Sequence, residues 1–284
     1  MPSKQHTFGQ YETPTDVADL LLGFCLRRPT DRVLDPSCGR GALLRRAARW
    51  QQWLAATPPP RPFATLAGVE VDPDALAAAR AALPHAALHL QNFFTLPPDP
   101  RALFDAVVGN PPYTRAEWLD ALAQESAAQL AFDWAAPPAA AAGNQLVPAP
   151  LWQQLNQRSG LYAYFLLHAT AFLREGGRLG FVLPNVWLDV DYGAPLKQFL
   201  LDHFKLIAVV ESDVERWFSD ARVNTCLAVL EKCSGPNRRA ANRVRLVQLK
   251  RPLAHLLPLP ADDYRRPQVV EQLVTRLLPG ADRR

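Results

Sequence analysis

Residues 104–113, FDAVVGNPPY, join a short apolar run to a turn that carries functional groups. Ala106–Val108 predicts a buried strand, which the following glycine and prolines must end. Asn110 and the carbonyl of Pro111 can each accept one N–H of an exocyclic amine, and Tyr113 can stack on a flat ring. Because the two prolines fix φ, these acceptors are placed before a ligand arrives. The stretch predicts either a site for an amino-bearing ring or a plain strand-ending turn.

The composition is typical of a cytoplasmic protein with a sizeable apolar core. The chain has 284 residues, 49% of them hydrophobic, which suffices for one large α/β domain and a small appendage. Its apolar runs are too short to span a membrane, and the polar start MPSKQHTFGQ is no signal peptide. We expect a cytoplasmic location and no membrane partner. Neither CxxC pairing nor metal-ligand spacing occurs among the cysteines, so reduced thiols and no metal site are expected: Cys25, Cys38, Cys226 and Cys233.

Positive charge is concentrated toward the C-terminus. From Gly235 onward there are 11 Lys and Arg against 4 Asp and Glu, whereas the rest of the chain holds 20 against 23. A slightly acidic body with a basic tail indicates a polyanion partner on the C-terminal side, or simply a solvated basic tail.

Strand and helix patterns alternate along the chain. In the first half the pattern predicts a helix from about 13 to 26 with Thr13 as N-cap, a strand over 32–35, a loop over 36–41, a helix over 42–56, a strand over 63–71, a helix from Asp72-Pro73-Asp74 to about Leu83, and strands over 87–91 and up to Asn110. In the second half it predicts an amphipathic piece over 117–132, a loop over 135–150, a helix over 161–174 stopped by Gly176-Gly177, a strand over 178–183, a helix over 194–203, an antiparallel pair over 206–210 and 225–230, one more strand over 244–249, and short helices near 252–257 and 268–278.

This alternation predicts an α/β fold with a mostly parallel sheet that is covered on both faces. Ligands of such sheets bind at the carboxyl ends of the strands. Four turns fall at this edge, and their shared placement is a stronger signal than any single motif: residues 35–41, 70–72, 92–93 and 110–113.

The turns that follow the first three strands indicate a nucleoside ligand. Gly39 and Gly41 let the backbone approach a ligand at a helix start, although simple entry into a helix explains them equally well. Glu70 can accept both hydroxyls of a ribose, or can be an exposed strand-end acid. Asn92 can face an adenine amino group. The third glycine of a dinucleotide loop is absent, with Leu44 in its place, so a nucleoside without pyrophosphate, such as S-adenosylmethionine, fits better.

Seven motifs in a fixed order resemble the N6-adenine DNA methyltransferases of the gamma motif order, the TaqI-like restriction-modification methylases. The resemblance spans about residues 8–250, and its motifs are GQYETP at 9–14, LDPSCGRG at 34–41, GVEVDP at 68–73, NPPY at 110–113, GLYAYFL at 160–166, GRLGFVLP at 177–184, and Trp217-Phe218 before VNT at 223–225. The resemblance implies a Rossmann-like class I S-adenosylmethionine-dependent methyltransferase fold, with a mostly parallel seven-stranded sheet that contains one antiparallel strand.

The resemblance also implies roles for individual residues. The methionine side of the cofactor S-adenosyl-L-methionine would be lined by Thr13, Asp35, Ser37 and Cys38, beside Gly39 and Gly41. Glu70 would hold the ribose of the cofactor. Val71 and Phe93 would flank its adenine, and Asn92 stands where the family usually has Asp. The target amine would be bound by Asn110 and Pro111 of the Asn110-Pro111-Pro112-Tyr113 turn, and the flipped base would lie between Tyr113 and Phe218.

The implied activity is methyl transfer to the N6 amine of a flipped-out adenine in DNA, within a restriction-modification or related system. Residues 1–235 would form the catalytic domain, and 236–284 a short basic connector that can be the start of a truncated target-recognition region. Recognition would then come from a missing C-terminal domain or a separate specificity subunit. Two alternatives stay open: a methyltransferase for another amine (cytosine N4, RNA adenine or protein glutamine), and a non-catalytic nucleic-acid-binding subunit.

Overall fold

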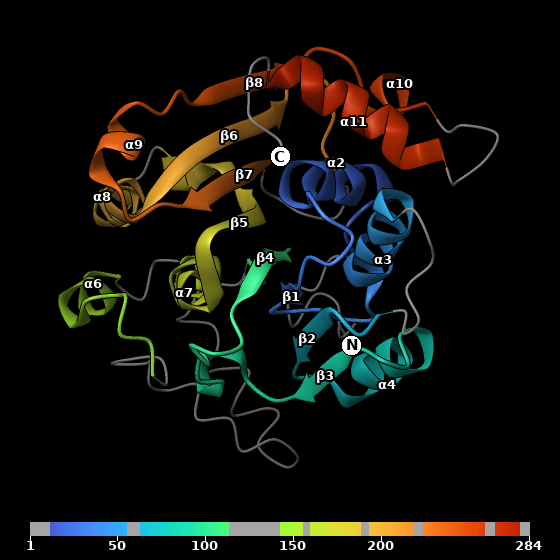
Figure 1. The fold of residues 1–284 in the computed structure, drawn as a ribbon. Helices are drawn as coiled ribbons and strands as arrows, with labels where there is room; N and C mark the ends of the chain where they lie inside the picture. Colours follow the sequence, from blue (N-terminus) through green and yellow to red (C-terminus); the bar gives the residue numbers. More distant parts are fainter. Residues whose placement is uncertain are drawn as a thin grey trace, which may run out of the picture.

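The fold is built on one eight-stranded sheet with the strand order β3-β2-β1-β4-β5-β7-β6-β8 (Figure 1). The computed structural model describes residues 12–55, 63–113, 143–155, 160–188, 193–218, 224–258 and 265–278. The strands are β1 (Val33–Asp35), β2 (Leu66–Glu70), β3 (Ala87–Leu90), β4 (Phe104–Gly109), β5 (Leu173–Pro184), β6 (Phe204–Ser212), β7 (Thr225–Lys232) and β8 (Arg245–Leu249).

The sheet is parallel except at β7, which pairs antiparallel with both β5 and β6. This confirms the expected mostly parallel sheet with one antiparallel strand. The expected number of seven strands is corrected to eight, because β8 adds a parallel strand at the edge beside β6. The main-chain groups of β6 that would otherwise form the edge of the sheet are thereby paired.

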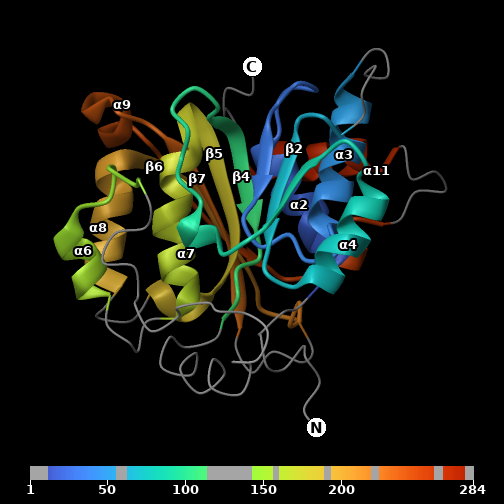
Figure 2. The ribbon, with the colours of Figure 1, turned by 90° about the horizontal axis from the view of Figure 1, so that it is seen from below.

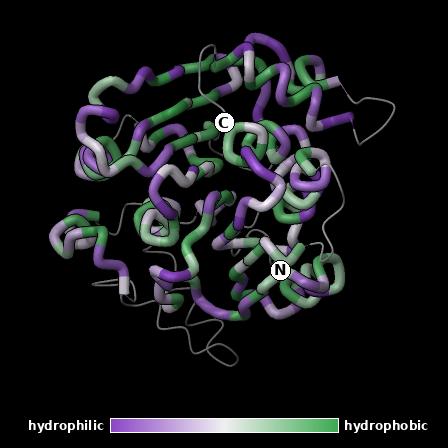
Figure 3. The backbone as a smooth tube through the Cα atoms, in the orientation of Figure 1, coloured by the Kyte–Doolittle hydropathy of each residue, from purple (hydrophilic) through white to green (hydrophobic). Residues whose placement is uncertain are grey.

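Helices cover both faces of the sheet, as Figure 2 shows in a view along the layers. One face carries α2 (Thr15–Cys25), α3 (Ala42–Leu54), α4 (Pro73–Ala82), α10 (Leu253–Leu256) and α11 (Arg266–Leu277). The other face carries α6 (Ala149–Gln154), α7 (Leu161–Ala169) and α8 (Gly193–His203). The short α9 (Pro236–Ala240) lies beside β6. Each face has its own apolar core. Much of α2 and of the central strands is hydrophobic (Figure 3), as expected for elements buried between layers.

A local sequence signal explains how α4 begins. Asp72 caps α4, because its Oδ1 accepts the backbone N–H of Asp74 at 2.9 Å, and Pro73 follows at the first helical position. The α2 prediction was one residue early. Pro14, not Thr13, is the N-cap residue there, and no side chain caps this helix.

The helix predicted over 161–174 is shorter than expected. α7 ends at Ala169, a 3₁₀ turn follows over Thr170–Phe172, and β5 already begins at Leu173. Gly176 therefore lies inside the strand and does not stop a helix. Its φ of +71° accommodates an irregularity in the pairing with β4, where Phe104 pairs with Leu173 but Ala106 pairs with Arg178.

Residues beyond 235 pack onto the same sheet and helical layer. β8 pairs with β6, and α11 packs against α2 and α3. Arg266 of α11 is completely buried and forms ion pairs with Asp16 and Asp19 of α2. Arg46 of α3 also pairs with Asp19, at 2.7 Å. These contacts join the first described helix to the last.

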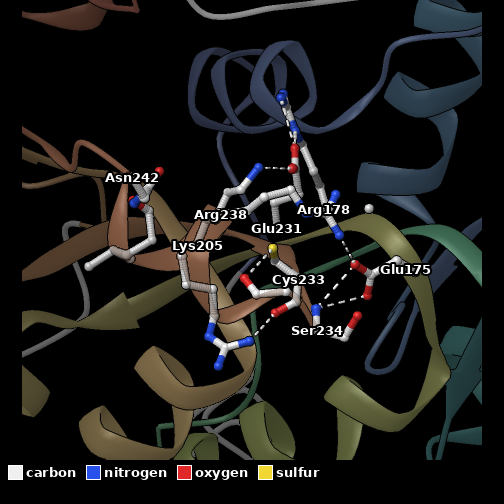
Figure 4. A network of polar contacts seen from close by, with 12 residues as sticks. Glu175, Arg178, Lys205, Glu231, Cys233, Ser234, Arg238 and Asn242 are labelled. Atoms are coloured by element: carbon white, nitrogen blue, oxygen red, sulfur yellow. Dashed lines mark hydrogen bonds and ion pairs between the residues drawn. The ribbon is translucent and has the colours of Figure 1, made fainter.

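A second polar network lies where β5 begins and β7 ends (Figure 4). Glu231 of β7 lies within 4 Å of three cations, with distances of 3.1 Å to Lys205, 3.4 Å to Arg178 and 3.6 Å to Arg27. The network lies where β5 begins, and β5 runs parallel to β1–β4. It therefore lies at the amino ends of these strands, opposite to their carboxyl ends.

Several expectations concern residues outside the described ranges. They are the proline-rich connection over 58–62, the amphipathic piece over 117–132, most of the loop over 135–150, and parts of the motifs at 9–14 and 223–225. Among the residues that the structure does describe, no helix is long and apolar enough to cross a membrane, and no cluster of His, Cys, Asp or Glu is suited to a metal ion.

Candidate active site

The carboxyl ends of β1, β2 and β4 bring the predicted site residues to one edge of the sheet. Asp35 ends β1 opposite Gly68 of β2, and β2 ends two residues later at Glu70. On the other side of β1, the position that a Cβ on Gly109 would take lies 3.4 Å from Asp35 Oδ1. The missing side chain at Gly109 thus leaves room for the carboxylate beside Asn110.

Glu70 organises the loop between β1 and α3. Its Oε2 accepts the backbone N–H of Gly39 at 2.8 Å, and its Oε1 accepts those of Val71 and Asp72 at 2.8 and 2.9 Å. The loop turns through glycines with positive φ, +52° at Gly39 and +79° at Gly41. Glu70 is 4% exposed, and this burial raises the pKa of its carboxyl. The acid that was predicted from the sequence to hold a ribose thus also shapes the glycine loop.

Asp35 is a buried acid at the centre of this edge. It is 3% exposed, and its Oδ1 accepts the backbone N–H of Ser37 at 3.1 Å. Burial raises the pKa of Asp35 to about 7, and the nearby Glu70 carboxylate adds to the shift. No cationic side chain among the described residues pairs with Asp35.

The Asn110–Tyr113 turn contacts the β1–α3 loop directly. Ser37 Oγ donates to the carbonyl oxygen of Asn110 at 3.4 Å. The hydroxyl of Tyr113 donates to the side-chain oxygen of Asn110 and lies 3.5 Å from the carbonyl oxygen of Val182 in β5. The candidate acceptor of a substrate amine is therefore already oriented by hydrogen bonding within the turn.

Phe218, the other ring of the predicted base sandwich, lies beside this turn. It comes from the segment after β6, and its ring contacts that of Tyr113 edge to face, with centroids 6.3 Å apart and planes at 86°. Phe218 is 5% exposed. The structure thus brings together two aromatic rings that are widely separated in the sequence.

In the turn after β3, the side chains of the predicted residues Asn92 and Phe93 contact other parts of the chain. Asn92 is buried, and its Oδ1 accepts the backbone N–H of Phe94 at 2.9 Å, so it caps a short 3₁₀ turn. Phe93 is 1% exposed, and its ring packs against Phe165 and His168, with centroid distances of 5.5 and 4.6 Å. That packing leaves little of the ring for a ligand, and a contact of Phe93 with adenine stays a prediction.

The other predicted residues line the same edge through their backbone or occupy its border. Cys38 is buried against Gly68, and its backbone N–H donates to Val69 O at 2.9 Å. Thr13 is half-buried just before α2, and among the described residues it forms no hydrogen bond with the strand-end cluster. Pro111 is buried, and Pro112 is half-buried beside it.

His168 was not found by sequence reasoning. Its Nε2 lies 3.1 Å from Leu96 O and its Nδ1 3.4 Å from Asn144 Nδ2. Burial lowers the pKa of His168 to about 4, so the neutral ring donates to Leu96 and accepts from Asn144. It thereby connects α7 to the turn that carries Asn92. A histidine in an otherwise apolar helix, HAT after YAYFLL, was the only available signal.

The chain is similar to known methyltransferases of restriction-modification systems. The family model described as Eco57I restriction-modification methylase matches residues 74–218, which is 145 of the 284 residues. The Type II methyltransferase M.PaeR7I of Pseudomonas aeruginosa is 28% identical over 49% of this chain and 21% of its own length. M.HincII of Haemophilus influenzae, also a Type II methyltransferase, is 23% identical over 75% of this chain and 35% of its own length. The chain thus spans about a fifth to a third of these relatives.

Solved structures share the fold. The methyltransferase subunit of a type I restriction-modification system from Streptococcus thermophilus superposes with a TM-score of 0.61 at 19% identity, covering 96% of this chain and 54% of that subunit. A putative class I S-adenosylmethionine-dependent methyltransferase from Listeria monocytogenes gives 0.57 at 17% identity, covering 94% and 71%. The chain belongs to the Eco57I restriction-modification methylase family and has the class I S-adenosylmethionine-dependent methyltransferase fold.

Proposed function

We propose that this chain transfers a methyl group from S-adenosylmethionine to the N6 amine of an adenine turned out of DNA. The observation that carries the proposal is the contact between the two halves of the site. Ser37 Oγ donates to Asn110 O at 3.4 Å, and Gly109 leaves space for Asp35. The loop suited to bind a methyl donor thus touches the turn suited to bind the amine that would receive the methyl group.

The residues at the edge suit S-adenosylmethionine. A Cβ placed on Gly39 would have no atom of the described residues within 4 Å, so the loop backbone faces open space beside Glu70. Glu70 can accept ribose hydroxyls there, and the buried Asp35 without a cationic partner suits the positive methionine end. When bound, S-adenosylmethionine supplies an electrophilic methyl group.

The chain's own contribution is to orient and polarise the amine. The lone pair of an exocyclic amine is delocalised into its ring, which makes the nitrogen a poor nucleophile. Two acceptors, Asn110 Oδ1 and Pro111 O, would hold its hydrogens and localise the pair on nitrogen. Alignment and preplaced dipoles then supply most of the rate enhancement. Tyr113, which bonds Asn110 through its hydroxyl, would exchange that bond for stacking on the captured base.

Sequence recognition is expected to depend on more than this chain. Its relatives are three to five times longer than the regions that match. We therefore propose that a C-terminal recognition region or a separate specificity subunit selects the target. The chain by itself should bind the cofactor and methylate DNA slowly, with little sequence preference. Fast and sequence-specific methylation by the purified chain would contradict this part of the proposal.

The test is transfer of labelled methyl groups from S-adenosylmethionine to DNA, RNA and protein, followed by nucleoside analysis. We expect N6-methyladenine from DNA. Asn110→Ala should lower kcat by about 100-fold or more, because the lost acceptor acts chiefly in the transition state, while cofactor affinity changes little. N4-methylcytosine, a labelled RNA or a labelled protein as the main product would overturn the assignment of the substrate.

A further inference from the structure

The segment that carries Phe218 is attached to the stretch that follows it in the sheet. Asp213 N–H donates to Leu249 O, the last residue of β8, at 3.1 Å. Lys250 forms an ion pair with Asp213. Glu215 accepts the backbone N–H of Leu253, the first residue of α10, at 2.7 Å. The β8–α10 junction therefore holds residues 213–218 at two points, three and five residues before Phe218.

Among the residues that form these contacts, Glu215 is the closest to Phe218 in the sequence. It is also the one best suited to fix the backbone of the segment that carries Phe218. It is half-buried, whereas the side chains of Asp213 and Lys250 are 37% and 69% exposed, so solvent screens their ion pair more strongly. Its own N–H donates to Ser212 Oγ at 3.2 Å. The residue thus bonds on one side to the end of β6 and on the other to the start of α10.

The geometry of the two rings shows why a fixed Phe218 matters. Their planes stand at 86°, and two such rings cannot both lie face-on against one flat base. At least one ring must turn when a base enters. Tyr113 is held through its hydroxyl by Asn110, and the proposed function gives Asn110 a new partner, the substrate amine. Tyr113 is then the ring that is released, and Phe218 is the one that must stay in place.

We propose that Glu215 is a positioning residue for base capture: through its hydrogen bond to Leu253 it holds the segment that presents Phe218 to the flipped base. This inference rests on the proposed function, because it assumes that Phe218 stacks on a base. It also assigns the β8–α10 junction to the base site, although these residues follow the matched family region, which ends at 218.

The test compares Glu215→Ala, Glu215→Gln and Phe218→Ala in the full chain. Each variant is titrated with a single-stranded oligonucleotide that contains one 2-aminopurine, whose fluorescence reports stacking. Glu215→Ala should weaken the stacked complex by about tenfold or more, the size expected for one lost hydrogen bond to a charged acceptor. Glu215→Gln keeps a side-chain oxygen that can accept from Leu253, so it should restore most of the loss. The KM for S-adenosylmethionine should not change.

The chain offers a matched control in Glu175→Ala. This carboxylate accepts a backbone N–H of the C-terminal stretch in the same way, from Ser234 at 3.1 Å, and it also pairs with Arg238 at 2.8 Å (Figure 4). It lies near the start of β5, at the opposite end of the sheet. Glu175→Ala should leave 2-aminopurine stacking unchanged even if it lowers the melting temperature.

The outcomes separate the two proposals. If Phe218→Ala weakens stacking and Glu215→Ala does not, the positioning role of Glu215 is wrong and the proposed function stands. A Phe218→Ala variant that stacks normally removes the premise of a base sandwich. Should Glu215→Ala fail to bind cofactor, Glu215→Asp replaces it, because the shorter side chain withdraws the acceptor from Leu253 and keeps the charge. Normal stacking by Glu215→Asp would then also overturn the inference.

Discussion

Asp35 makes the stability of the cofactor-free protein depend on pH. Its carboxyl is buried without a cationic partner among the described residues, and its pKa is raised to about 7. In the unfolded chain this carboxyl titrates near 4. The native protein therefore holds a proton between about pH 4 and pH 7 that the unfolded chain has lost. The contribution of Asp35 to the free energy of unfolding falls as the pH rises through this window.

The first prediction is that Asp35→Asn stabilises the cofactor-free protein and weakens cofactor binding. At pH 7 or above the variant should unfold with a free energy higher by on the order of 1–3 kcal/mol, because a buried carboxylate is removed, and the difference should shrink toward pH 4. Urea unfolding and calorimetric titration with S-adenosylmethionine at several pH values measure both effects. An affinity of the wild-type protein that does not rise from pH 6 to pH 8 would speak against ionised Asp35 as the partner of the cofactor's positive end.

Tyr113 gives the second prediction, because its ring and its hydroxyl have separable roles. Tyr113→Phe removes the hydrogen bond to Asn110 and keeps the ring, so stacking on 2-aminopurine should persist. Tyr113→Ala removes the ring and should weaken stacking by about 1–3 kcal/mol. Equal losses in the two variants would mean that the hydroxyl, and not the ring, governs base capture.

At the scale of elements, α11 is joined to α2 by a charged network inside the core. Arg266 is completely buried between Asp16 and Asp19, and its Nη1 also donates to Leu257 O. Asp19 is itself 0% exposed. Burying these charges is tolerable only because each finds partners of opposite sign or a backbone acceptor.

The third prediction follows from that burial. Arg266→Ala should lower the free energy of unfolding by about 3 kcal/mol or more, since it leaves buried carboxylates without their partner. Arg276→Ala on the same helix is the control, because Arg276 is exposed and its side chain donates to Gln272 O at a distance of 3.4 Å. Similar urea midpoints for the two variants would show that the buried network contributes little.

At the scale of the whole molecule, two exposed arginines lie at the edge of the sheet that carries the candidate site. Arg216 and Arg251 are exposed and flank the junction between the Phe218 segment and β8, at the edge where the parallel strands end. None of the described residues forms an ion pair with either of them. Under the proposed function, DNA that delivers a base to Tyr113 and Phe218 would approach this region, and its phosphates would find two cations there.

The fourth prediction is therefore a change in salt dependence. For the double variant Arg216→Gln and Arg251→Gln, the slope of log affinity for DNA against log salt should become shallower by about 2, since each lost phosphate contact removes about 0.9. Arg101→Gln, an exposed arginine just before β4, should leave the slope unchanged. Filter-binding or anisotropy titrations at several salt concentrations provide the measurement. An unchanged slope in the double variant would place the DNA elsewhere.

The sequence alone determined the features that depend on neighbouring residues. Alternating apolar runs gave the order of strands and helices, the Asp72-Pro73-Asp74 cap gave the start of α4, and the strand-ending turns identified the edge where Asp35, Glu70 and Asn110 meet. These are set by backbone preference, capping and turn chemistry over a few residues, which a sequence displays directly. The start of β5 was misjudged because Gly176-Gly177 was interpreted as the stop of a helix, whereas the strand runs through both glycines where its pairing with β4 is irregular.

Only the tertiary structure decided which distant residues touch. The contacts of Glu215 with Leu253 and of Arg266 with Asp16 form because three layers pack in one particular way. The same is true of β8 beside β6 and of the burial of Phe93 against α7. Such contacts depend on how whole faces of elements exclude water together, and no local pattern around either partner encodes them.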